Sequence, residues 1–247
     1  MMKREYESFP MYKEFRYEIL KNNEGKYVKI LDFDNSTSSP VLPAYIKDIP
    51  VTVIGKDAFE RSNIKTITLP DTLTTIEAYA FFNCRNLEKI SFPDSVRDVG
   101  HQVCGLCQQL EEAKWSELAH IMPACAFYGC FSLKNISNID SVYIFSEYCF
   151  DKTGLESITI PKKISTISHY ALGECPNLKI IKMSHLPNID KEAFKASENI
   201  QIDCCGNGKV KEWAKKHGFP IIENKLNTFL QDLNEEVENS EKGCDKQ

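Results

Sequence analysis

The sequence of 247 residues has no long hydrophobic run and no excess of positive charge. No apolar stretch approaches the roughly 20 residues that a membrane-spanning helix needs, so we expect no such segment. Lysine and arginine number 30 against 35 aspartates and glutamates, and residues 223–247 carry -4 of the total charge of -5. The nearly neutral remainder lacks the basic surface that nucleic-acid binding requires, so we expect no nucleic-acid partner.

The beginning of the sequence also lacks the uninterrupted apolar core of a secretory signal peptide, because charges interrupt MMKREYESFPMYKEF throughout. The chain carries ten cysteines, and many free thiols are typical of a reducing compartment. Together these two features predict a cytoplasmic protein.

Motifs that carry catalytic chemistry are missing as well. There is no glycine-rich phosphate loop and no pair of histidines one helical turn apart. His101 and His169 share a position in the repeat described below, but they stand three coils apart. At one strand spacing per coil this is about 14 Å, too far to hold one metal ion. We therefore expect no enzymatic activity, no cofactor and no metal.

What the sequence does contain is an internal repeat of 22 or 23 residues, seen most clearly in residues 76–98. An aliphatic column consists of Ile54, Ile76, Val99, Met122, Phe145, Ile167 and Ile189. Four residues later comes a mostly small column and then a large one, which begin with Ala58, Ala80, Val103 and Ala126 and with Phe59, Phe81, Cys104 and Phe127. Hydroxyls and thiols make up a fourth column: Ser62, Cys84, Cys107, Cys130, Thr153, Cys175 and Ser197. Such regularity predicts a stack of about seven similar coils.

Each coil also contains a short alternating run, which in the clearest repeat is LEKISF at residues 87–92. Ile90 and Phe92 face one side and Lys89 and Ser91 the other, as in a half-buried strand. Pro93 follows and ends the strand, because proline has no N–H to donate. A unit this small cannot bury its apolar side alone, so the coils must stack into a β-rich solenoid with one continuous core.

The pattern Ile-x-x-x-Ala-Phe-x-x-Cys-x-x-Leu-x-x-Ile-x-Phe-Pro of residues 76–93 resembles the BspA-type leucine-rich repeat. Residues 42–55 also resemble the way such arrays begin, and the likeness extends over about residues 40–220. The resemblance implies a curved β solenoid that binds proteins or surfaces, often in bacterial adhesins, and so implies a cell-surface location as an alternative to the cytoplasm. It implies no particular ligand, because the family is defined by its core columns.

The chain divides into five parts around this array. Residues 1–14 read as a loose arm, and residues 15–53 as a β cap with a hairpin that turns at residues 22–25. The solenoid follows at residues 54–203, and residues 204–222 form a cap whose short helix places Trp213 against the last coil. Residues 223–247 are an acidic tail, which the pattern leaves open between a docked helix and disorder.

The cysteines fall mostly within the repeat, which argues against a chemical role. Cys104 and Cys107 form a C-x-x-C pair, but both are members of core columns. We interpret the column cysteines as buried thiols that donate to turn backbone, in preference to a metal site or a disulfide. Cys204 and Cys205 near the end of the array and Cys244 in the tail lie outside the columns and are expected to be exposed and reactive.

The middle of the array departs from the pattern. Ala113 next to Trp115 indicates that a small and a large core residue compensate for each other. Asn138 takes the place of Phe92 in its coil, and an amide there needs partners. We expect a β-bulge that turns Asn138 outward, although bonding to neighbouring backbone is the alternative.

The strand positions that face away from the core predict a binding surface. Stacked in one solvent-facing sheet, they are Thr66, Thr68, Lys89, Ser91, Glu112, Lys114, Asn135, Ser137, Ser157, Thr159, Ile180 and Lys182. The sequence therefore predicts a monomeric, non-catalytic module that binds an unknown protein or glycan through this sheet. The alternative is an assembly protein that self-associates through an end of the solenoid or through the tail.

Overall fold

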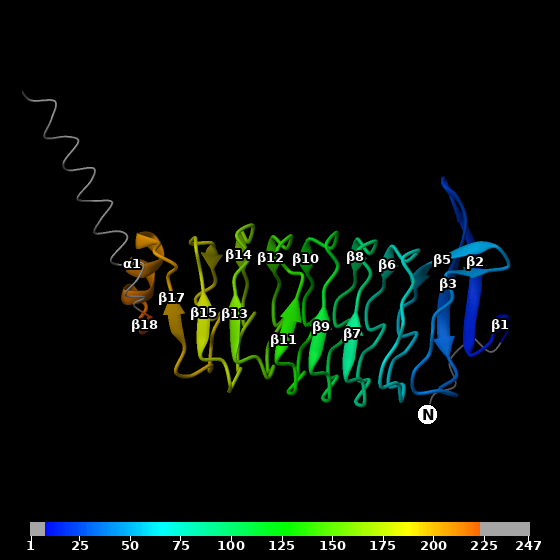
Figure 1. The fold of residues 1–247 in the computed structure, drawn as a ribbon, viewed down its shortest axis with the longest axis horizontal. Helices are drawn as coiled ribbons and strands as arrows, with labels where there is room; N and C mark the ends of the chain where they lie inside the picture. Colours follow the sequence, from blue (N-terminus) through cyan, green and yellow to red (C-terminus); the bar gives the residue numbers. More distant parts are fainter. Residues whose placement is uncertain (1–7, 223–247) are drawn as a thin grey trace, which may run out of the picture.

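The computed structural model describes residues 8–222, which form a solenoid of about eight turns, with short strands stacked along one axis (Figure 1). A first strand row consists of β5 (Ile49–Ile54), β6 (Thr75–Ile76), β8 (Asp98–Val99), β10 (Ile121–Met122), β12 (Ile144–Phe145), β14 (Thr166–Ile167) and β16 (Asn188–Ile189). A second strand row consists of β7 (Lys89–Ser91), β9 (Glu112–Lys114), β11 (Asn135–Ser137), β13 (Ser157–Thr159), β15 (Ile180–Lys182) and β17 (Gln201–Asp203). Neighbouring strands within each row are parallel, as the repeat predicts.

Neither row is continuous. The first row divides between β8 and β10, and the second divides between β11 and β13. Thr66 and Thr68 belong to no strand, although Thr68 forms an isolated parallel bridge with Val41. The expectation of one solvent-facing sheet is therefore wrong: the structure has two ladders, β7-β9-β11 and β13-β15-β17, and a separate Thr66–Thr68 segment.

The N-terminal cap is a hairpin of β2 (Phe15–Asn22) and β3 (Gly25–Phe33), as the alternation predicts. β3 pairs in parallel with β5 and so provides the strand that precedes the first coil of the repeat, while β4 (Tyr45–Ile46) pairs antiparallel with β5. Phe15 and Phe33 cover the end of the core by packing on Phe59, with ring centroids 6.3 and 5.3 Å away. The expected loose arm is partly ordered, because β1 (Met11–Tyr12) pairs with β2.

The C-terminal cap is the helix α1 (Gly208–Lys216), whose first turn is capped by the side chain of Asn207. Trp213 packs edge-on against Phe194 of the last coil at 6.4 Å, as predicted. Gly218 then adopts a φ of 76°, a conformation that suits glycine at a helix end. β18 (Ile221–Ile222), which the sequence did not reveal, pairs with β17 and extends the sheet. The acidic tail of residues 223–247 lies outside the described residues.

The core consists of the repeat columns, which are almost completely buried. Phe59 stacks on Phe81 at 5.1 Å, and an aromatic series continues across the following coils. Trp115 fills the space beside Ala113 and contacts Phe92 at 5.3 Å, with Phe127 at 6.0 Å on its other side. The small residue next to the tryptophan agrees with the volume compensation that the sequence indicates.

Five members of the hydroxyl and thiol column donate to the backbone of the preceding coil, while Thr153 donates to Phe150 of its own coil. Cys84 Sγ lies 2.9 Å from the Phe59 carbonyl oxygen, Cys107 Sγ 3.2 Å from that of Phe81, and Cys130 Sγ 3.1 Å from that of Cys104. Ser197 Oγ makes the same bond to Leu172 at 2.8 Å. Burial raises the pKa of the thiols of Cys84 and Cys107, so both remain protonated donors.

All cysteines among residues 8–222 are free, in agreement with the interpretation of the column cysteines as thiols. Outside the columns, Cys205 is exposed, but Cys204 is buried, so the expectation that Cys204 is exposed is wrong. Burial raises the pKa of Cys205 above that of an ordinary thiol, which does not favour a reactive thiolate. Cys244 lies outside the described residues.

Asn138 does not produce the expected bulge, since the register of β11 with β9 is regular. The chain instead takes a φ of 62° at Asn138, directly after the strand. The amide nitrogen then donates to the Trp115 carbonyl oxygen at 2.9 Å and to Asp94 at 3.0 Å. The alternative interpretation, bonding to neighbouring backbone, is therefore the one that the structure supports.

The turns contain pairs of residues with positive φ, which the sequence did not predict. Most coils place two such residues four positions apart, as in the pairs Asp57 and Arg61, Tyr79 and Asn83, Gln102 and Leu106, Cys125 and Gly129, Tyr148 and Lys152, and Tyr170 and Glu174. This conformation costs on the order of 1 kcal/mol for a residue other than glycine. In return, alternate N–H groups of the turn reach carbonyls of the next coil, for example from Phe59 to Ala80 at 2.8 Å.

Gly129 provides a test of this strain. A Cβ at residue 129 would lie 2.7 Å from Leu106 Cδ2 with φ at +69°, whereas at Gly208 it would meet nothing within 4 Å. We expect Gly129→Ala to lower the free energy of unfolding by about 1–2 kcal/mol. Gly208→Ala, at the start of α1, should be neutral or stabilise by up to about 1 kcal/mol. Urea denaturation measures the free energy of unfolding of both variants. An equal change in the two variants would contradict the strain at residue 129.

Asp151 is the buried carboxylate of the array. Its side chain is 1% exposed, and Oδ1 has no hydrogen-bond partner. Burial raises its pKa from 3.8 to about 6, since Lys152 offsets only part of the cost. The folded protein therefore retains the proton where the unfolded chain has lost it, and stability falls as pH rises from about 4 to 6.

Replacing Asp151 with Asn should remove this pH dependence. At about pH 7 we expect Asp151→Asn to raise the free energy of unfolding by about 1–3 kcal/mol, because no charge is desolvated. At about pH 3 and below the two proteins should differ little, because the aspartate is then mostly protonated in both the folded and the unfolded state. Urea denaturation at the two pH values measures the difference in the free energy of unfolding. If Asp151→Asn stabilised the protein equally at both pH values, Asp151 would not have the raised pKa.

Candidate binding surfaces

The second strand row places most of the predicted residues side by side. In the first ladder, one line runs through Lys89, Glu112 and Asn135 and the other through Ser91, Lys114 and Ser137. In the second ladder the corresponding lines are Ser157 with Ile180 and Thr159 with Lys182. We call these ten residues, with Thr66 and Thr68, the strand face. The parallel register holds each line at about one strand spacing, roughly 5 Å.

The second ladder also extends the lines beyond the predicted set. Gln201 continues from Ile180, and Asp203 continues from Lys182. Their coil follows the same alternation, so this signal was present in the sequence. Ile180 is half-buried and not fully exposed, which reduces its value as an isolated apolar contact.

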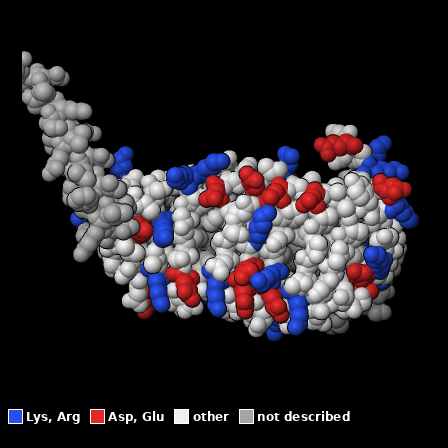
Figure 2. All heavy atoms as spheres, viewed as in Figure 1, with Lys and Arg blue, Asp and Glu red and all other residues white. Residues whose placement is uncertain are grey.

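Charges of both signs are interspersed along the solenoid (Figure 2). Lys89 Nζ lies 2.9 Å from Glu112 Oε2, and this hydrogen bond raises the pKa of Lys89. Lys114 Nζ lies 3.2 Å from Asp94, and its hydrogen bond lowers the pKa of that carboxyl. Exposed pairs of this kind add little stability, so both lysines are available to a partner.

The first strand row contains a feature that the sequence analysis missed, at the division between β8 and β10. In other coils the residue after the strand donates its N–H to the preceding coil: Glu77 to Ile54 at 2.9 Å, Gly100 to Ile76 at 2.8 Å and Ser146 to Met122 at 3.1 Å. The corresponding residue after β10 is Pro123, which has no N–H to donate to Val99. A proline at this position of the repeat was the signal that could have revealed the break.

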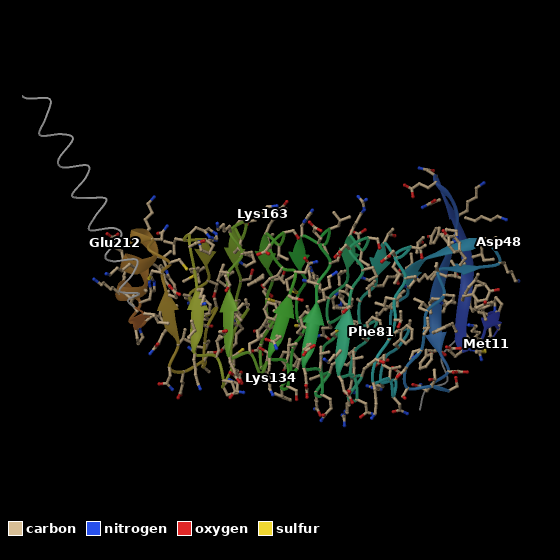
Figure 3. All side chains as sticks on the ribbon, in the orientation of Figure 1. Met11, Asp48, Phe81, Lys134, Lys163 and Glu212 are labelled. Atoms are coloured by element: carbon tan, nitrogen blue, oxygen red, sulfur yellow. The ribbon has the colours of Figure 1, made fainter. Side chains whose placement is uncertain are left out.

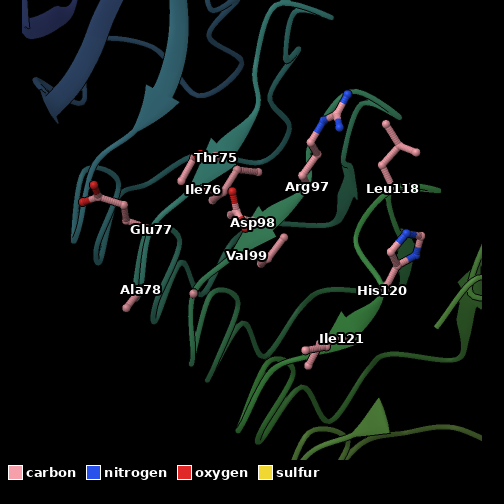
Figure 4. Close-up of a pocket in the computed structure, with 11 residues that line it drawn as sticks. Thr75, Ile76, Glu77, Ala78, Arg97, Asp98, Val99, Leu118, His120 and Ile121 are labelled. Atoms are coloured by element: carbon pink, nitrogen blue, oxygen red, sulfur yellow. The ribbon is translucent and has the colours of Figure 1, made fainter. Parts of the chain in front are cut away.

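A groove of about 650 Å³ lies at this break (Figure 4). One wall comes from β8 and the preceding turn, with Arg97, Asp98 and Val99. The other comes from Leu118, His120 and Ile121. Leu118 and Ile121 are 38% and 51% exposed, and Tyr143, whose ring stacks on His120 at 5.0 Å, is 41% exposed. The break therefore combines an apolar surface with charged side chains.

The histidines form no reactive group among the described residues. His169 Nδ1 lies 3.3 Å from Asp190, and Nε2 lies 3.7 Å from Glu192. His101 belongs to a different group, packing edge-on against Tyr79 at 4.9 Å. Within residues 8–222, no three His, Cys, Asp or Glu side chains are grouped so that they could hold a metal ion. The same residues contain no helix long and apolar enough to cross a membrane.

Comparison with known proteins supports the architecture. A crystal structure of a leucine-rich cell surface protein from Faecalibacterium prausnitzii is 24% identical, with a TM-score of 0.53, and the match covers 74% of this chain and 55% of that protein. A leucine-rich repeat protein from Eubacterium ventriosum gives 21% identity and a TM-score of 0.58 over 74% of this chain and 50% of that one. The Treponema pallidum leucine-rich repeat protein gives 18% identity and a TM-score of 0.55, and the match covers 87% of this chain and 98% of that protein.

At these identities the likeness establishes the fold alone. The chain spans about half the length of the Faecalibacterium and Eubacterium proteins. No functionally curated protein is significantly similar to the sequence. The BspA type leucine-rich repeat region, in contrast, matches in six copies over residues 44–142 and 107–210, which is more than half of the chain. With the columns buried and the coils in parallel register, the chain belongs to the BspA-type leucine-rich repeat family.

Proposed function

We propose that the protein is a non-catalytic binding module that presents the strand face to a protein or glycan partner. The observation that carries the proposal is the parallel register of Lys89, Glu112 and Asn135 and of Ser91, Lys114 and Ser137. These side chains project at a fixed spacing from strands that are hydrogen-bonded to one another, with β9 paired on both sides, so little conformational entropy is lost when a partner binds.

The chemistry of the strand face favours a polar partner of mixed charge. Ten of its twelve residues are exposed, and Lys114 and Ile180 are half-buried. Hydroxyl, amide, ammonium and carboxylate groups alternate along it, which suits hydrogen bonding to a protein surface or to sugar hydroxyls. Nucleic acid is disfavoured, because Glu112 stands within the same line as Lys89 and pairs with it.

We propose that this binding takes place at a cell surface, because the structurally similar Faecalibacterium prausnitzii protein is a cell surface protein. The cytoplasmic expectation relied partly on free thiols. Seven of the nine cysteines among residues 8–222 are buried, and the thiols of Cys84, Cys107 and Cys130 donate to backbone carbonyls. Buried thiols held in this way report little about the redox state of the compartment.

A triple substitution tests the strand face. Lys89→Ala, Lys114→Ala and Lys182→Ala together should weaken binding at least about tenfold, because lysines that contact a partner lose charge-assisted hydrogen bonds. The partner is first identified by screening the intact chain on panels of extracellular proteins and glycans, and its Kd is then measured by surface plasmon resonance.

The matched control carries Lys26→Ala, Lys163→Ala and Lys209→Ala, which remove equal charge from exposed positions outside the strand face. Figure 3 shows Lys163 at the edge of the solenoid opposite Lys134, which precedes β11. The control should bind like the unmodified chain. Equal loss in both triple variants, or no loss in either, would exclude the strand face. Light scattering over a concentration series checks that self-association does not account for the signal.

A further inference from the structure

The groove between β8 and β10 interrupts an otherwise regular ladder, and the interruption leaves backbone groups without partners. No hydrogen bond among residues 8–222 reaches the carbonyl oxygens of Arg97 or Val99. The equivalent oxygen of Thr74 accepts two hydrogen bonds from the next coil, and that of Ile76 accepts one. Unpaired groups at a sheet edge are the ordinary site at which an extended segment of another protein adds to a sheet.

The break also opens the core to the surface. Val99 belongs to the aliphatic column, and its neighbours Ile76 and Met122 are completely buried, but Val99 itself is only partly buried. Leu118 and Ile121 face the same space and are both exposed. An apolar surface that is concave and continuous with the core gains most when a partner's apolar side chain covers it.

Arg97 supplies the positive charge of the groove, and the neighbouring Asp98 supplies a negative one. Among residues 8–222 the Arg97 guanidinium makes no ion pair and no side-chain hydrogen bond, whereas Glu77 at the other end of the groove is already paired with Lys29 at 2.8 Å. In Figure 4 the Arg97 side chain extends toward Leu118, whereas Ile121 lies at the other end of the groove, beyond Val99. A free guanidinium beside apolar side chains is suited to bind a carboxylate in two parallel hydrogen bonds.

We propose that this groove binds an extended segment of a partner protein that carries an apolar side chain and a carboxylate on the same face. The apolar side chain covers Val99 and Ile121, and the carboxylate meets Arg97. The partner's backbone donates to the unpaired carbonyl oxygens of Arg97 and Val99. This site shares no residue with the strand face, so it stands whether or not that surface binds anything.

The test uses synthetic peptides of about six residues, the usual length of a strand. In the probe set, Leu, Ile or Phe stands two residues from Asp or Glu, so that both side chains lie on one face. In the comparison set the acid is replaced by Asn or Gln. Binding of fluorescent peptides to the full chain is followed by anisotropy, and we expect the acidic set to bind at least about tenfold more tightly than its neutral counterpart.

Three variants connect binding to the groove. Arg97→Gln should lower the affinity for the acidic peptides about tenfold, so that they bind no more tightly than the neutral set. Arg85 is an exposed arginine elsewhere, and Arg85→Gln should leave the affinity for both sets unchanged. Ile121→Ser should weaken both sets. Pro123→Ala supplies the missing N–H, so β8 and β10 should pair and the amide of residue 123 should be protected from hydrogen exchange. This variant should therefore bind the peptides more weakly. The control Pro70→Ala should leave peptide binding unchanged.

Several results would overturn the proposal. The acidic peptides could fail to bind the folded chain, or could bind no more tightly than the neutral peptides. Arg97→Gln and Arg85→Gln could change the affinity equally. A Pro123→Ala variant whose amide at residue 123 is protected from exchange could bind with unchanged affinity. Two further measurements address other occupants of the groove. Arg97-dependent binding on a glycan array, or an Arg97-dependent dimer in analytical ultracentrifugation, would each replace the partner segment with that occupant.

Discussion

The whole architecture depends on hydrogen bonds between the backbones of successive coils. Each coil has too few residues to enclose its own apolar side chains, so it folds only when a neighbour covers it. The two strand rows and the turns all contribute such bonds, from Glu77 to Ile54 in the first row and from Phe59 to Ala80 in the turns. Positive φ at many turn residues is tolerated because these bonds and the packing beneath them fix the chain.

The same dependence explains the column of hydroxyls and thiols. Ser197 and Cys175 perform one task, donating to a carbonyl of the preceding coil at 2.8 and 3.1 Å. A residue at this position must be small, must be able to donate and must survive burial, and only Ser, Thr and Cys meet all three conditions. Cysteine here is therefore a packing residue, and a high cysteine content says nothing about catalysis in this fold.

Where the backbone ladder is interrupted, the surface changes character. Pro123 removes one donor from the first strand row, and the result is a groove with exposed Leu118 and Ile121 and a partly uncovered core residue. The two ladders of the second strand row, in contrast, expose mostly small polar and charged side chains, of which Lys89 and Glu112 pair with each other. The two surfaces therefore offer different chemistry: the strand face suits a broad polar contact, and the groove suits an inserted apolar side chain with a charged neighbour.

The sequence by itself determined the repeat, the core and both caps, because a residue that must be buried in every coil leaves a column that can be read without coordinates. Phe81, Cys84 and Ile90 were assigned in this way, and all three are buried. Tertiary structure decided which strands pair, although Pro123 was a signal in the sequence for one of the two breaks. Ser137 and Ser157 read as neighbours in one sheet, yet their ladders are separate, and the first row breaks at Pro123. The reason is physical: burial is a property of one side chain and its column, whereas pairing depends on the relative position of two backbones, which the sequence of either coil does not specify.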